Sequence, residues 1–66
     1  MKVVANGETV QLGADAGLID LLDQLGLGAK WVVAEVNGEA VARRDMAGVR
    51  LHEGDRVELV RAVAGG

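Results

Sequence analysis

The sequence predicts an α+β domain in which a mixed sheet of four to five strands carries one helix on a single face. Three observations predict it: β-prone runs joined by Asn-Gly dipeptides, one stretch of leucines at helical spacing, and a chain of 66 residues. A domain this short buries only about 60% of the surface that its unfolded chain exposes. One helix on one sheet face is the economical way to bury both apolar stripes, so we expect this architecture.

The first expected element is a β-hairpin over residues 1–12, MKVVANGETVQL. Asn6-Gly7 joins its two β-prone runs, and Asn-Gly tolerates the positive φ angles of a tight type I′ turn. Because side chains alternate between the two faces of a strand, one face collects the residues that we expect in the core. These are Met1, Val3, Ala5, Val10 and Leu12.

An amphipathic helix follows, in which four leucines have i, i+3, i+4, i+7 spacing. They are Leu18, Leu21, Leu22 and Leu25. We expect the helix to begin between Asp15 and Gly17, where an acidic residue suits the positive end of the helix dipole. It should end at Gly26, because glycine is a favourable C-terminal cap.

A second β-prone run, WVVAEVNGEAV, covers residues 31–41 and contains another Asn-Gly turn, at Asn37-Gly38. Glu35 should face water, so the alternation places Trp31 and Val33 on the same outer face. The residues between them face inward: Val32, Ala34 and Val36.

In the last third of the chain, residues 43–48 are expected to be irregular. The run VRLHEGDRVELVRAV then predicts a short strand, a turn at residues 53–55 and a final strand. In that strand Val57 and Leu59 should point inward, while Glu58 and Val60 point outward.

Composition excludes several classes of function. The chain has no Cys, no Ser, one Thr and one His, so its inventory of activated nucleophiles is nearly empty. His52 lies beside Glu53 in an expected turn, where a solvated histidine is far commoner than a metal ligand or general base. We expect no catalytic residue, no metal site and no bound cofactor, and a carrier or binding protein rather than an enzyme.

Charge and hydropathy narrow the choice of partners. The net charge of −3 argues against nucleic acid, which is bound by clustered Lys and Arg. No apolar run approaches the roughly 20 residues needed to span a bilayer, and the first residues, MKVVANG, lack the apolar stretch of a signal peptide. With no cysteine, a cytoplasmic location is the simplest expectation.

The sequence closes with Gly65 and Gly66. Glycine loses the most backbone entropy on ordering and has nothing to pack, so we expect residues 63–66 to be a flexible tail on a domain of residues 1–62. A tail without side chains can thread a narrow channel, and residues 62–66 would reach roughly 16 Å when extended. Frayed ends and cloning scars also end in glycine, so the tail alone leaves both interpretations open.

Two segments resemble the ThiS family, the sulfur-carrier proteins of thiamin biosynthesis: VNGEAVARRD, residues 36–45, and EGDRVELVRAVAGG, residues 53–66. The helix LIDLLDQLGL is similar to the family's helix, and the length and the Gly-Gly ending match. The chain departs from the family pattern at Ala42, where proline is common, and at Met46, where tryptophan is frequent. The resemblance covers all 66 residues and implies the β-grasp, or ubiquitin-like, fold.

The resemblance also implies a mechanism. An E1-like adenylyltransferase, similar to ThiF, would bind ATP and adenylate the carboxylate of Gly66. A persulfide sulfur would then displace AMP and leave a C-terminal thiocarboxylate, which thiazole synthase, similar to ThiG, would use as its sulfur source. Gly66 would carry the sulfur, and Ala64 and Gly65 would form the narrow tail before it.

Partner binding is expected on the sheet face away from the helix. A single helix cannot also bury the apolar residues on that face, so we interpret them as a docking patch: Trp31, Val33, Val60 and Ala62. Trp31 could equally cover the sheet edge, because lone exposed apolar residues are normal. Arg61 precedes the tail, where it is either a solvated charge or a partner for an acidic groove on the activating enzyme.

Three other functions remain open at this point. The small subunit of molybdopterin synthase shares the fold, the Gly-Gly end and the thiocarboxylate chemistry, and would differ in its acceptor enzyme. A ubiquitin-like modifier would form isopeptide bonds with protein lysines. A plain β-grasp interaction module would not use its tail at all.

Overall fold

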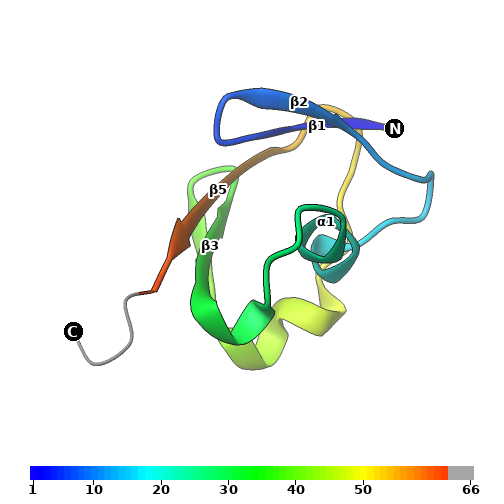
Figure 1. Cartoon of the computed structure of the whole chain (residues 1–66). Coiled ribbons are helices and arrows are strands. Elements are labelled where there is room, and N and C mark those ends of the chain that lie inside the picture. The colour runs from blue at the N-terminus through cyan, green and yellow to red at the C-terminus, as the bar shows by residue number, and fades with distance from the viewer. Residues whose placement is uncertain (63–66) are drawn as a thin grey trace.

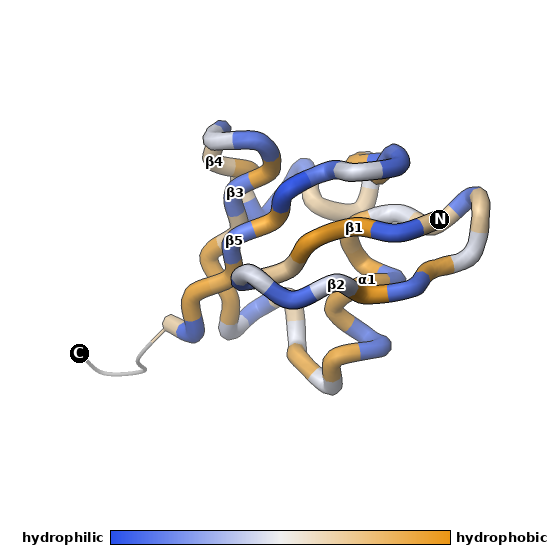
Figure 2. The backbone as a smooth tube through the Cα atoms, turned by 90° about the horizontal axis from the view of Figure 1, so that it is seen from above, coloured by the Kyte–Doolittle hydropathy of each residue, from blue (hydrophilic) through white to orange (hydrophobic). Residues whose placement is uncertain are grey.

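The computed structural model describes residues 1–62, and within them five strands form one mixed sheet with a helix against one face (Figure 1). The strands lie side by side in the order β2-β1-β5-β3-β4 (Figure 2). β1 and β5 run parallel, and the other neighbouring pairs are antiparallel. The strands are β1 (Lys2–Ala5), β2 (Glu8–Gln11), β3 (Val32–Val36), β4 (Glu39–Val41) and β5 (Arg56–Arg61). The predicted α+β class is confirmed.

Both Asn-Gly dipeptides form the tight turns that the sequence predicts. Asn6 and Asn37 have φ angles of 50° and 51°, and the glycines after them also have positive φ. Each asparagine side chain then holds the central strand β5. The amide of Asn6 donates to the Leu59 carbonyl at 3.0 Å and accepts from the Leu59 N–H at 2.7 Å, while Asn37 Oδ1 accepts from the Arg56 N–H at 3.0 Å.

Asp55 ties the start of β5 to the β3–β4 turn. Its carboxylate accepts hydrogen bonds from Asn37 Nδ2 at 3.0 Å and from the His52 N–H at 2.7 Å. The largely exposed His52 imidazole lies with Nδ1 3.7 Å from the same carboxylate. Partial burial works to raise the pKa of Asp55, but the hydrogen bonds from Asn37 and His52, together with the nearby imidazole, hold it below its usual value.

This lowered pKa predicts a pH-dependent contribution to stability. A carboxyl group whose pKa is lower in the folded than in the unfolded chain stabilises the fold above the unfolded pKa, about 3.9 for aspartate, and this contribution is lost as the pH falls through the folded pKa. We expect Asp55→Asn to melt below the wild type near neutral pH, and the gap to narrow below about pH 4. Thermal melts from neutral to acidic pH measure this. Asp23→Asn, which changes an exposed carboxylate on the helix, is the control; an Asp55→Asn gap that stays constant with pH would contradict the prediction.

The helix α1 (Leu18–Gln24) lies across one sheet face and places its leucines in the core. Gly17 precedes its first turn, and Gly26 follows it with a φ of 73°. The N–H groups of Gly26 and Leu27 donate to the carbonyls of Asp23 and Leu22, a Schellman arrangement that ends the helix at the predicted place. The largest fully buried side chains are Leu18, Leu21, Leu22, Met46, Leu51, Val3 and Val57.

The segment before β5 differs from its prediction in two places. Residues 43–48 are not irregular but form a 3₁₀ helix, η2 (Arg43–Gly48), which buries Met46 in the core. Residues 49–52 form no strand: they make one isolated bridge, between Gly17 and Arg50. The Val49 carbonyl there accepts from the Leu18 N–H, and the Leu51 N–H donates to Ala16, so the start of the helix uses the hydrogen-bonding groups that a strand would need.

The inward faces of the strands agree with the predicted alternation. Val3, Ala5 and Leu12 are buried in the hairpin, and Val32 and Ala34 are buried in β3. Met1, Val10 and Val36 are partly buried and pack against this core. Among residues 1–62, no helix is long and apolar enough to cross a membrane.

Candidate functional site

The end of β5 is the place where the described chain leaves the sheet (Figure 1). The Ala62 N–H donates to the Trp31 carbonyl at 2.7 Å, which extends the β3–β5 pairing by one residue. Trp31 closes a short 3₁₀ helix, η1 (Ala29–Trp31), directly before β3. The predicted tail residues Ala64, Gly65 and Gly66 lie outside the described residues. The structure therefore defines the surface from which the tail begins.

Two valines form an exposed apolar pair on the sheet face away from α1. Val33 and Val60 lie opposite each other in the β3–β5 ladder and are 53% and 63% exposed. Their neighbours along the strands, Ala34 and Leu59, are buried on the helix side. We call Val33 and Val60 the outer patch. The sequence predicted both from the alternation, and the structure brings them together.

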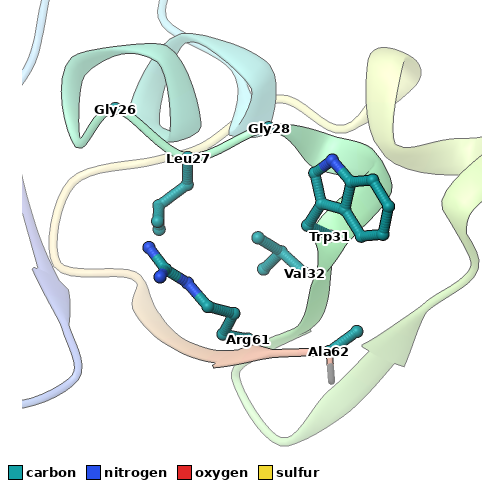
Figure 3. Close-up of a pocket in the computed structure, with 7 residues that line it drawn as sticks. All are labelled: Gly26, Leu27, Gly28, Trp31, Val32, Arg61 and Ala62. Atoms are coloured by element: carbon teal, nitrogen blue, oxygen red, sulfur yellow. The ribbon is translucent and has the colours of Figure 1, made fainter. Parts of the chain in front are cut away.

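A groove lies at the same end of the sheet, between the α1–β3 connection and the end of β5 (Figure 3). We call it the end groove. It has a volume of about 330 Å³ and is lined by Gly26, Leu27, Gly28, Trp31, Val32, Arg61 and Ala62. Three of the five predicted partner-binding residues, Trp31, Arg61 and Ala62, line this groove. It is thus continuous with the start of the tail.

Trp31 is held by close neighbours although half of it is exposed. A Cβ atom on Gly28 would lie 3.3 Å from Trp31 Cδ1, so the glycine lets the indole lie close to the backbone. Lys30 Nζ lies 5.7 Å from the ring centroid, within the range of a cation–π contact. Arg43 Nη2 donates to the Lys30 carbonyl at 2.9 Å and connects this turn to η2.

Arg61 does not lie on the same face as Val60. It is in register with Val32, whose side chain is buried, so Arg61 belongs to the helix side of the sheet. Figure 3 shows its guanidinium group extending across the end groove toward Leu27. The predicted partner-binding residues therefore fall into two adjoining surfaces, the outer patch and the end groove.

Sequence reasoning missed Leu27 and Gly28 as lining residues of the end groove. The available signal was the string Gly26-Leu27-Gly28 directly after the helix, in which one apolar residue stands between two glycines. Leu27 is only partly buried against the core, which leaves part of its side chain to the groove.

Comparison with known proteins identifies the family. The ThiS family model matches residues 2–66. This chain belongs to the ThiS family. It is also similar over its whole length to the crystal structure of the thiamine biosynthesis protein ThiS from Geobacter metallireducens, with 28% identity, full coverage of both chains and a TM-score of 0.83. A solution structure of a thiamine biosynthesis protein from the same organism gives 30% identity and a TM-score of 0.79, covering all of this chain and 88% of that one.

The ThiS assignment confirms the resemblance and the β-grasp fold predicted from the sequence. A curated relative, a thiazole synthase from Paramagnetospirillum magneticum, is 36% identical over 66 residues. That match takes in all of this chain but only 20% of the relative, so the chain spans about a fifth of the relative's length. A ThiS-like segment is therefore part of a protein named thiazole synthase.

Proposed function

We propose that this ThiS-family chain carries sulfur as a thiocarboxylate on Gly66. An E1-like enzyme adenylates the Gly66 carboxylate: a carboxylate oxygen attacks the α-phosphorus of ATP, and pyrophosphate leaves. A persulfide sulfur then attacks the acyl carbon and AMP leaves, which gives an acyl disulfide. A thiol reduces the S–S bond of that disulfide and releases the thiocarboxylate.

The observation that carries this proposal is the family match, which runs to residue 66 and so includes both terminal glycines. The chemistry explains why a partner enzyme and ATP are needed, because a carboxylate is a poor electrophile and an acyl adenylate has a good leaving group. The described residues contain no buried polar or charged side chain, so this part of the chain offers no enclosed catalytic group. ATP, the sulfur donor and the catalytic residues are assigned to the partners.

Thiazole synthase is the acceptor that we propose for the sulfur. The support is the relative named thiazole synthase, of which one segment is similar to this chain from end to end. A carrier and an acceptor that act in succession gain effective concentration when they are joined in one protein. The outer patch and the end groove, next to the start of the tail, are the surfaces proposed to dock the two partners.

Intact-mass spectrometry tests the carrier role. After incubation with ATP, the activating enzyme of the same organism and a persulfide donor with a thiol reductant, the mass should rise by the difference between one sulfur and one oxygen atom. A variant that lacks Gly66 is the control. Its residues 1–62 should fold as in the wild type, and its mass should not change on incubation. The proposal would be refuted if the wild-type mass did not change although the same enzyme preparations load sulfur onto the carrier that they normally use.

A further inference from the structure

Two glutamates face each other directly beside the outer patch. Glu35 and Glu58 are in register in the β3–β5 ladder, two pairs further along the same strands than Val33 and Val60 and therefore next to them on the same face. All four side chains are exposed, and those of Glu35 and Glu58 share the face away from α1. Directly opposite residues in an antiparallel pair have Cβ atoms only about 4.5–5.5 Å apart, so two like charges in these positions repel each other.

The described part of the chain does not neutralise this pair. No Lys, Arg or His of residues 1–62 forms a salt bridge with either glutamate. Arg56 lines the same shallow hollow as Glu35 and Glu58, but it lies within salt-bridge distance of neither. One arginine beside two carboxylates also leaves a net negative charge. The free carrier therefore keeps a repulsion that a cation from outside can relieve.

The apolar pair and the acidic pair together define the chemistry of what covers them. We propose that the activating enzyme covers the outer patch with apolar side chains and places a lysine or arginine against Glu35 and Glu58. This inference rests on the proposed function, because it describes the partner of that reaction. The apolar pair supplies contact area from which water is excluded, and the acidic pair supplies attraction and orientation.

A second copy of this chain is a poorer occupant of the same face. A symmetric dimer through the outer patch would use the same surface on both copies, so both acidic pairs would lie at one interface. The repulsion already present within one copy would then increase. A basic partner removes that repulsion, which is why the face selects a different protein.

The test compares stability with activation in the same variants. Replacing both residues, Glu35→Gln with Glu58→Gln, should raise the melting temperature by roughly 2–4 °C, because the repulsion is removed. The same double variant should raise the KM of the activating enzyme for the carrier by about three- to tenfold at low salt, with kcat unchanged, since exposed charges act mainly on association. At high salt the two KM values should converge, because ions screen the attraction.

Glu58→Lys gives a sharper readout, because it creates an opposite-charge pair with Glu35 and presents a cation to the partner. Glu58→Lys should be at least as stable as the double variant, and the KM of the activating enzyme for it should be higher than for the double variant. Glu8→Gln is the matched control. It removes one exposed glutamate from β2, which lies at the opposite edge of the sheet from β4, and it should change neither the melting temperature nor the KM by a comparable amount.

The outcomes separate this inference from the proposed function. If the wild type is adenylated and the double variant has an unchanged or lower KM, or if Glu8→Gln raises the KM as much, the basic partner surface is refuted while the carrier role stands. If sedimentation shows that the wild type dimerises and that Val60→Lys abolishes the dimer, the face belongs to a second copy. If the wild type is not adenylated at all, the proposed function fails and this inference fails with it.

Discussion

Gly17→Ala is expected to lower the free energy of unfolding by about 2–3 kcal/mol, the cost of overfilling a tightly packed site. A Cβ atom on Gly17 would lie 2.7 Å from the Val49 carbonyl oxygen. That oxygen is a backbone atom and already accepts the Leu18 N–H at 2.9 Å, so it cannot move without breaking the bond that fixes the start of α1. For a domain of this size the change corresponds to a fall of roughly 10–20 °C in melting temperature.

Gly13→Ala is the matched control for this prediction. A Cβ atom on Gly13 would meet nothing within 4 Å, and its φ angle is not in the left-handed region. Replacing glycine at such a site restricts the unfolded chain and stabilises a protein by about 0.4–1 kcal/mol. Thermal or urea melts of the two variants should therefore move in opposite directions. Equal stability of Gly17→Ala and the wild type would mean that the contact between the helix start and residue 49 is not rigid.

The turns and the alternating faces could be predicted from the sequence because they depend on local geometry. Asn6-Gly7 and Asn37-Gly38 signal positive φ angles by residue type alone, and both pairs adopt them. The hydrogen bonds between the Asn6 side chain and the Leu59 backbone could not be predicted in this way. They join residues 53 positions apart, and nothing in the local sequence signals them.

The segment before β5 shows where local reasoning failed. VRLH at residues 49–52 alternates like a strand, but its backbone groups are used by residues 16–18. Met46 is a single apolar residue in a stretch of charged and small residues, so no hydrophobic periodicity indicated the 3₁₀ helix that buries it. In both places tertiary contacts overrode the local pattern.

The candidate site also has a part that the local pattern predicted and a part that depends on tertiary contacts. The alternation predicted Val33 and Val60 as outward residues, and strand pairing placed them in register. The end groove depends on how the α1–β3 connection meets the end of β5, so the Gly26-Leu27-Gly28 string alone did not identify Leu27 and Gly28 as its lining residues. The role proposed for Gly66 came from the family resemblance, since composition alone left the meaning of the terminal glycines open.

Val60→Lys is expected to lower kcat/KM for adenylation of the carrier by about 10- to 100-fold, mainly through KM, because a charge would be buried at the centre of the docked surface. The free protein should remain folded, since Val60 is 63% exposed and its side chain faces away from the core. Pyrophosphate release, measured over a range of carrier concentrations, gives kcat and KM separately. A melting curve of each variant confirms that the fold is intact.

Leu25→Lys is the control that makes this result specific. Leu25 is also a large exposed apolar residue, 41% exposed, but it caps the C-terminal end of α1 and is not part of the outer patch. A lysine there adds the same charge and interacts favourably with the helix dipole. If Val60→Lys and Leu25→Lys are activated equally well, the activating enzyme does not dock on the outer patch. The end groove would then be the surface to test, beginning with Trp31→Ala. A defect confined to Val60→Lys would place the enzyme on the sheet face next to the start of the tail, where docking can deliver Gly66 to the bound nucleotide.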